Sequence, residues 1–315
     1  MNEQRATEQG SGRRLVNERP AAALVRPAAP LRPRPSYCPK VSPVCCVPGL
    51  ISMAVRALLV GGASAAAAAT LMILQSRKKK PSFTLGYWDI RGLAAPARMM
   101  LVYAGAEFED KMFELKQKEE GNGWDAEEWF DECRPALRQK NAFINLPYLI
   151  DEGTGLVVTQ STAIYQYLGR KLELMGSSEA EEAAAEQTLA QAFDLRNELV
   201  RIVYPFSGTT PEKFPGALTK HMKSISSSHY DKFSRFLGDK PFFAGQSPTA
   251  GDFHVWEMLD QHELMATQFG KSSPLEEYPA LRAFHKRMRQ LPRLAPYFES
   301  EAARLPCNNR MANFK

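Results

Sequence analysis

Residues 85–98 read LGYWDIRGLAAPAR, and the rest of the chain is organised around them. Tyr87 and Trp88 favour a strand, Gly92 interrupts it, and the alanines that follow favour a helix that tolerates Pro96 in its first turn. The stretch therefore predicts a strand, a turn and a helix. Tyr87 falls beside the helix N-terminus, where its phenol can donate a hydrogen bond to a bound anion. The alternative is that Tyr87 and Trp88 are ordinary half-buried strand aromatics.

The elements on either side of this stretch follow the order βαβ and then αββα. A right-handed crossover makes the first two strands parallel, and Glu152-Gly153-Thr154-Gly155 is the turn of a later hairpin. We expect strands at 83–88, 108–113, 146–150 and 156–159, helices at 93–103, 125–137 and 161–172, and a polar loop at 116–124. The order indicates an α/β thioredoxin-like domain, which we assign to residues 81–173.

Past Gly176 the strand signals stop, and the pattern predicts helices at 179–203, 211–237, 249–265 and 278–291. Thr249 and Asp252 have the spacing of a capping box at the start of the third of these helices. Residues 174–315 are therefore expected to form an all-α domain.

The first 80 residues differ in composition from the rest. They carry 13 Lys and Arg against 3 Asp and Glu, whereas residues 81–315 carry 27 against 32. The basic pI thus belongs to this extension and gives no argument for nucleic-acid binding. Residues 1–52 are rich in Arg, Pro and Ala, which predicts disorder.

Residues 57–74 form an uninterrupted 18-residue stretch without a charge, followed by Arg77 and three lysines. This length can just span a bilayer. The charge bias favours a membrane anchor that leaves the folded part in the cytosol. Organellar targeting, a secretory signal if translation begins at Met53, and a soluble cytoplasmic protein if the extension is not translated are the alternatives.

The cysteines, and the short motifs that the sequence lacks, exclude several other classes of protein. Three cysteines lie in the extension and only Cys133 and Cys307 in the folded part, so the sequence predicts neither a disulfide framework nor a zinc site. The chain has no nucleotide-binding glycine motif, metalloprotease motif or nucleophile elbow.

The segment GYWDIRGLA (residues 86–94) resembles the amino terminus of mu class cytosolic glutathione transferases. The resemblance continues over residues 83–315, in the family's order and at near-family separations. It rests on NLPYLID (145–151), TQSTAI (159–164), Asp194 with Tyr204 ten residues later, and FFAGQSPTAGDF (242–253). It implies a transferase that conjugates the glutathione thiolate to small hydrophobic electrophiles and needs no cofactor besides this co-substrate and no metal. A non-catalytic glutathione or hydrophobic-ligand carrier, and a glutathione-dependent isomerase or peroxidase, stay open.

The resemblance also implies which residues bind glutathione. Tyr87 would stabilise the thiolate, since a neutral phenol can donate a charge-assisted hydrogen bond to sulfur. Leu146 would pair through its main chain with the glutathione peptide, after a cis bond to Pro147; an ordinary strand start would have a trans bond. The remaining implied residues are Trp88, Leu93, Asn145, Gln160 and Ser161, the last two at the γ-glutamyl carboxylate. Without the family, Ser161 would be read as a helix N-cap.

Further implied residues complete the site. Trp129, in EEWFDE, would bind the glycyl carboxylate, but two flanking positions that are usually basic are Ala126 and Cys133 here, where Arg134 or Lys140 are possible substitutes. Asp194 would reach the γ-glutamyl ammonium of a neighbouring subunit, or be one more solvated helix charge. The electrophile pocket maps to Ile90, Leu93, Val200 and Tyr204 under a C-terminal lid, with Tyr204 as a general acid. Phe143 matches an interface aromatic, which implies a homodimer.

Overall fold

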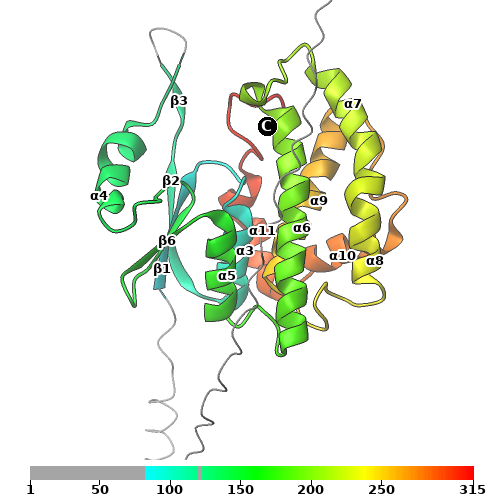
Figure 1. Ribbon diagram of the computed structural model, residues 1–315, viewed down its shortest axis with the longest axis horizontal. Helices are drawn as coiled ribbons and strands as arrows, with labels where there is room; N and C mark the ends of the chain where they lie inside the picture. Colours follow the sequence, from blue (N-terminus) through cyan, green and yellow to red (C-terminus); the bar gives the residue numbers. More distant parts are fainter. Residues whose placement is uncertain (1–81, 119–122) are drawn as a thin grey trace, which may run out of the picture. The chain divides into compact units, whose positions relative to one another are not determined.

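The computed structural model describes residues 82–118 and 123–315 (Figure 1). The extension 1–80 and its apolar stretch 57–74 lie outside the described residues, so their disorder and any membrane or targeting role stay predictions. Within the described ranges, no helix is both long enough and apolar enough to cross a bilayer. The division of the folded part after residue 173 also stays a prediction.

A four-stranded mixed sheet forms the first layer, with strand order β2-β1-β5-β6. Its strands are β1 (Ser82–Trp88), β2 (Glu107–Phe113), β5 (Tyr148–Asp151) and β6 (Leu156–Thr159). The pairing of β1 with β2 is parallel, and the other two pairings are antiparallel. The predicted βαβ crossover and hairpin are therefore confirmed. Because β1 is central, nearly all of its residues are buried.

Two helices of the first half accompany the sheet: α3 (Ala95–Ala104) and α5 (Ser161–Lys171). They pack against each other, and both also contact the long helix α9 (Ala250–Gln268; Figure 1). Helix α3 has Pro96 in its first turn and ends at Gly105, whose φ of 65° suits a glycine. The helix predicted from the opening stretch is confirmed.

The segment between β2 and β5 differs from the prediction. The polar loop contains a short antiparallel pair, β3 (Lys116–Gln117) and β4 (Trp124–Asp125). The expected helix at 125–137 is a π-helical turn, η1 (Glu128–Cys133), followed by α4 (Arg134–Arg138). Pro135 has no N–H to continue a regular helix, which explains the break. A two-residue strand pair has no periodicity of its own, so the sequence did not show it.

The second half is helical, as predicted. Its α-helices are α6 (Glu179–Val203), α7 (Phe214–Ile225), α8 (Asp231–Leu237), α9 (Ala250–Gln268), α10 (Pro279–Arg289) and α11 (Ala295–Glu299). Four short helical segments connect or follow them: η2 (Pro205–Ser207), η3 (Ser226–Tyr230), η4 (Pro292–Leu294) and η5 (Glu301–Arg304). The single helix predicted at 211–237 is thus wrong in its middle, where the π-helical η3 separates α7 from α8.

Helix α9 is the centre of the helical half and is buried on almost every side. It packs along α6 and also contacts α3, α5 and α10. Its start is fixed by the predicted capping box, in which Asp252 Oδ2 accepts the Thr249 N–H at 2.8 Å. The other oxygen of Asp252 accepts the Phe243 N–H at 2.8 Å. The helix that holds the core is therefore also tied to the preceding loop.

Candidate functional site

The register of the sheet brings three predicted site segments to one edge. Gly86 of β1 pairs with Tyr148 of β5, which pairs with Thr159 of β6. Going outward from this row, the next residue of each strand segment is a predicted site residue: Tyr87, Pro147 and Gln160. Segments more than 50 residues apart in sequence therefore meet beside the turn that precedes α3. The fold itself explains why the predicted residues lie together.

Tyr87 lies against the turn between β1 and α3. Its side chain is 5% exposed, and Gly92 has a φ of 39° and faces it. A Cβ on Gly92 would lie 2.9 Å from the Tyr87 hydroxyl oxygen, so only glycine fits. Burial raises the pKa of Tyr87 above its usual value, while the Arg196 charge and the Leu93 main-chain N–H act in the opposite direction. The phenol is therefore protonated at neutral pH and able to donate.

The segment Asn145–Leu146–Pro147 is held by the Thr159 hydroxyl. This hydroxyl accepts the Asn145 N–H at 3.2 Å and lies 2.9 Å from the Asn145 and 3.1 Å from the Pro147 carbonyl oxygen. The predicted cis bond between Leu146 and Pro147 is confirmed. Within the described residues neither the N–H nor the C=O of Leu146 makes a hydrogen bond. Its main chain can therefore pair with an extended peptide.

Gln160 and Ser161 form the junction of β6 and α5. Gln160 has a φ of 72°, an unusual conformation for a residue other than glycine, and it is the N-cap position. Reading Ser161 as an N-cap was therefore wrong: Ser161 is the first residue of the helix, and it is buried. Strain of this kind is often retained at binding sites. The hydroxyl and the free N–H groups of the first helical turn suit a carboxylate.

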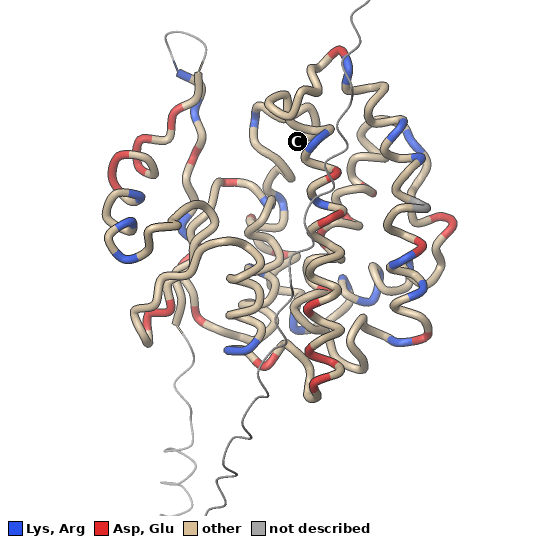
Figure 2. The backbone as a smooth tube through the Cα atoms, viewed as in Figure 1, with Lys and Arg blue, Asp and Glu red and all other residues tan. Residues whose placement is uncertain are grey.

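Trp129, in the η1 turn, is buried rather than open to solvent. Its ring stacks on Tyr148 at 5.9 Å and lies 5.4 Å from that of Phe113. The hollow beside it is lined by two lysines, Lys116 and Lys118, and by five acids, Glu114, Asp125, Glu127, Glu128 and Glu132. Figure 2 shows acidic positions along the β3–β4 pair and the η1 turn that follows it. The surroundings of Trp129 are therefore predominantly acidic.

Of the two departures from the family pattern, Ala126 is buried and Cys133 is half-buried. Arg134 and Lys140 make no ion pair among the described residues. The predicted compensation by either of them stays a prediction.

On the electrophile side, the C-terminal tail connects the β1–α3 turn with the end of α6. The N–H groups of Arg91 and Gly92 donate to the carbonyls of Pro306 and Cys307. The Asn309 N–H donates to the Tyr204 hydroxyl at 3.1 Å. Burial raises the pKa of Tyr204 to about 12, so its own proton stays in place at neutral pH. Of the other predicted pocket residues, Ile90 is buried, while Leu93 and Val200 are half-buried against the same apolar cluster.

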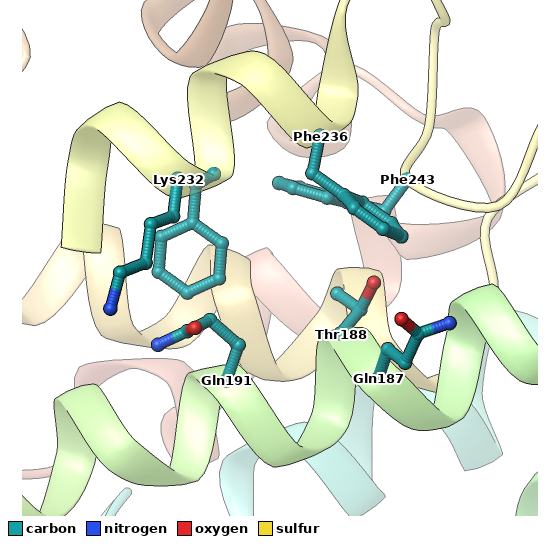
Figure 3. Close-up of a pocket in the computed structure, with 7 residues that line it drawn as sticks. Gln187, Thr188, Gln191, Lys232, Phe236 and Phe243 are labelled. Atoms are coloured by element: carbon teal, nitrogen blue, oxygen red, sulfur yellow. The ribbon is translucent and has the colours of Figure 1, made fainter.

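Asp194 is not one of the residues that the fold brings together at the sheet edge or on the electrophile side. It is exposed on α6 in a polar hollow shared with Arg201 and His229, and it has no hydrogen bond or ion pair among the described residues. A second cavity, of about 140 Å³, lies further along α6, between it and α8 (Figure 3). Phe233, Phe236 and Phe243 line it, opposite Gln187, Thr188 and Gln191. Phe143, in the other half of the chain, is 79% exposed.

Several residues that shape the site were not singled out from the sequence. Thr159 was quoted only within a motif, and Arg91 only within the opening stretch. The signal for Arg91 was nevertheless present, because a charged residue lies in an apolar turn while Glu257 and Asp260 lie three apart on an apolar helix. A buried ion cluster is the physical solution for such residues.

Comparison with known proteins agrees with this geometry. The family model described as "Glutathione S-transferase, N-terminal domain" matches residues 83–170, and "Glutathione S-transferase, C-terminal domain" matches residues 193–301. Glutathione S-transferase Mu 1 of Oryctolagus cuniculus is 36% identical over 69% of this chain and 90% of its own. Glutathione S-transferase Mu 3 of Homo sapiens is 32% identical over 74% and 95%. The chain belongs to the glutathione S-transferase family and is mu-like.

Solved structures give the same result for the fold. The glutathione S-transferase Blo t 8 aligns with a TM-score of 0.61 and 27% identity over 73% of this chain and 99% of its own. The Pi-class glutathione S-transferase of Onchocerca volvulus aligns with a TM-score of 0.57 and 26% identity over the same shares. The unmatched part of this chain corresponds in length to the extension.

Proposed function

We propose that this chain binds glutathione along the sheet edge and transfers its sulfur to small hydrophobic electrophiles, a detoxifying conjugation. The single observation that supports this most is the place of the buried Tyr87 hydroxyl beside Gly92, at the same sheet edge as Leu146, whose main chain makes no hydrogen bond among the described residues. The names of the mu class relatives point to the same activity.

The chemistry depends on the thiolate. A free thiol of this kind has a pKa near 8.5, and each unit of depression needs about 1.4 kcal/mol of differential stabilisation. The Tyr87 O–H donates to the sulfur anion, which then forms a bond to the electrophilic carbon, while the leaving group departs with its electron pair. The thiol proton goes to solvent. Tyr204 accepts the Asn309 N–H and keeps its own proton for an oxygen that becomes anionic on the electrophile.

The rest of glutathione would lie along the same edge. Leu146 would pair with the cysteinyl peptide, and Gln160 with Ser161 would bind the γ-glutamyl carboxylate. Trp88, Leu93 and Asn145 would border the peptide, and Trp129 would face the glycyl carboxylate. Asp194 of a second copy would bind the γ-glutamyl ammonium, which is consistent with its exposure and with its making no ion pair or hydrogen bond in the described part of this chain.

Steady-state kinetics of the full-length protein with glutathione and three probes test the proposal. Turnover of 1-chloro-2,4-dinitrobenzene is expected to exceed that of cumene hydroperoxide. Binding of a hydrophobic dye without turnover of either substrate would contradict the proposal and favour the carrier alternative. Hydroperoxide turnover alone would favour the peroxidase alternative.

We also propose that two copies associate by inserting Phe143 of one into the cavity between α6 and α8 of the other. Phe143 is 79% exposed, so its ring is available to a second copy, and a cavity of about 150 Å³ can hold one benzene ring. The cavity beside Phe236 is about 140 Å³ (Figure 3). Its three phenylalanines would surround the inserted ring.

Sedimentation of two matched variants tests the assembly. Phe143→Ala is expected to weaken self-association by about 30-fold or more, since buried aromatic anchors contribute at least about 2 kcal/mol. Phe206→Ala removes another phenylalanine, 72% exposed, from the η2 turn and serves as the control. Equal dissociation constants for the two variants, or a fully active monomeric wild type, would refute the model.

For the extension we propose that residues 57–74 anchor the protein in a membrane, with the transferase part in the cytosol. The uncharged length and the four basic residues that follow it support this proposal. After alkaline carbonate extraction the full-length protein is expected in the pellet, with the folded part open to added protease. A soluble, processed form that begins near Pro81 would instead indicate a targeting sequence.

A further inference from the structure

The turn between β1 and α3 is held in place by contacts with distant parts of the chain. Arg98, fully buried on α3, donates to the Ile90 carbonyl at 2.7 Å and pairs with Asp110 of β2 at 2.8 Å. The Arg91 N–H donates to the Pro306 carbonyl at 2.8 Å, and the Gly92 N–H to that of Cys307 at 3.1 Å. The backbone of the turn is thus fixed by both the sheet layer and the C-terminal tail.

The Arg91 side chain adds a third attachment, to α9. Its Nη2 lies 2.7 Å from Glu257 Oε2 and 2.7 Å from Asp260 Oδ2, and its Nε donates to Glu257 Oε1 at 3.1 Å. Arg91 is 5% exposed and Glu257 fully buried. The cluster continues through Gln261, which donates to Glu257, and His285, 3.1 Å from Asp260. Nearly every polar atom of this cluster is therefore satisfied, and its geometry is well defined.

The next two residues of the turn face the proposed catalytic phenol. Gly92 lies so close to Tyr87 that a Cβ there would be 2.8 Å from its ring. The Leu93 carbonyl accepts the Tyr165 hydroxyl at 2.6 Å, and the Leu93 main chain is one of the groups that lower the pKa of Tyr87. A polar main-chain group beside the phenol oxygen strengthens the phenol as a donor to the sulfur. The position of Leu93 therefore affects how well Tyr87 stabilises a thiolate.

A buried ion cluster is not the arrangement that stabilises a core most, if close packing is all that the core requires. Apolar side chains of similar volume often stabilise a core as well or better, whereas charges fix one arrangement of the segments that carry them. Here the fixed segment is the one that carries Gly92 and Leu93 to Tyr87. We propose that Arg91, held by Glu257 and Asp260, is a positioning residue that keeps the Gly92–Leu93 backbone against the Tyr87 hydroxyl.

This inference rests on the proposed role of Tyr87, and its test keeps the two apart. The readout is the pH dependence of kcat/KM for 1-chloro-2,4-dinitrobenzene at saturating glutathione, whose midpoint gives the pKa of the enzyme-bound thiol. Asp260→Asn retains both bonds of Arg91 to Glu257, and Arg91→Lys retains the charge but not the bidentate fork. Both variants are expected to raise the midpoint by roughly half a unit to one unit, about three- to tenfold in thiolate-to-thiol ratio, with little change in glutathione binding.

Lys171→Met is the matched control. It removes another ion pair to a buried acid, that of Lys171, the last residue of α5, with Asp151 at 2.8 Å. It is expected to lower the melting temperature without moving the midpoint. If Arg91→Lys does not fold, Asp260→Asn decides the question.

Three outcomes are distinguishable. If Asp260→Asn and Arg91→Lys lose stability while the midpoint stays at the wild-type value, the cluster is merely structural and the inference is wrong. If Tyr87→Phe raises the midpoint and the cluster variants do not, the role of Tyr87 stands and only the positioning fails. If Tyr87→Phe itself leaves the midpoint unchanged, the proposed function of Tyr87 fails first.

Discussion

The two ends of the proposed glutathione site differ in how they are built. At the thiol end, the turn at 89–94 is fixed by buried charges, by the sheet and by the tail. At the glycyl end, the described parts of residues 114–133 hold two-residue strands and a π-helical turn, and the ion pair of Lys116 with Glu114 there is exposed. Because buried, paired groups hold one geometry and exposed ones do not, the thiol end is preorganised and the glycyl end is not.

This difference indicates which positions of the site can depart from the family's residues. Stabilising a thiolate requires a donor placed to within a fraction of an ångström, so the turn beside Tyr87 tolerates little change. Binding a carboxylate at the surface needs only a nearby cation, whereas Ala126 lines a hollow with five acids, and both Ala126 and Cys133 stand where the family resemblance implies basic residues. We therefore expect intact chemistry combined with weak affinity for glutathione.

The largest effect is expected from Gly92→Ala, which adds a methyl group at the fixed end. The new Cβ would lie 2.8 Å from the Tyr87 ring, at a φ of 39° that alanine disfavours. A shift of Tyr87 by about 1 Å should lower kcat by about 100-fold. Steady-state kinetics at saturating glutathione measure this loss.

Gly105→Ala is the control for backbone strain alone. Gly105 has a φ of 65°, and a Cβ there would meet nothing within 4 Å. This variant should lose roughly 1 kcal/mol of unfolding free energy and retain wild-type kcat. Equal kinetic losses in the two glycine variants would show that strain, and not the contact with Tyr87, is responsible.

An intermediate effect is expected at the glycyl end from Ala126→Lys, which places a cation in the hollow beside Trp129, where the family resemblance implies a basic residue. A charge-assisted contact with the glycyl carboxylate should lower KM for glutathione by about five- to tenfold and leave kcat nearly unchanged. Ala126→Met, of similar length without the charge, is the control. The improvement should shrink in 1 M salt. A KM that falls equally in both variants would mean that packing, not charge, limits affinity.

The smallest effect is expected from Lys116→Met, which removes an exposed pair between Lys116 Nζ and Glu114 Oε2, 3.4 Å apart. Such pairs contribute about 0–1 kcal/mol, so chemical denaturation should show almost no change. Glu257→Gln at the thiol end should lower the unfolding free energy by about 3 kcal/mol, because it weakens a buried ion pair. Similar losses of unfolding free energy in the two variants would show that the thiol end is no more firmly held than the glycyl end.

Much of this site follows from sequence, because it lies where elements begin and end. The strand and turn around Tyr87, the hairpin after Pro147 and the junction at Gln160 all have local signals, and the sheet order then brings them together. Likewise, the capping box of Thr249 and Asp252 is a four-residue pattern. These features depend on neighbours in sequence, which a single chain reveals.

The remainder depends on contacts between distant segments. Arg91 meets Glu257 and Asp260 across more than 160 residues, and no local pattern encodes that encounter. The short strands at Lys116–Gln117 and Trp124–Asp125 exist only as a pair. The π-helical turn before Pro135 replaces the regular helix that composition predicted. Tertiary contacts decide each of these cases, and propensity does not.

The most direct measurement of the central claim is a titration of enzyme-bound glutathione by thiolate absorbance near 240 nm, in wild type and in Tyr87→Phe. In the wild type the bound thiol should have a pKa well below that of free glutathione. In Tyr87→Phe the pKa should rise by at least about one unit, the loss of one charge-assisted hydrogen bond, with a nearly unchanged glutathione dissociation constant. An equal pKa in the two proteins would contradict the assignment of Tyr87 as the residue that stabilises the thiolate.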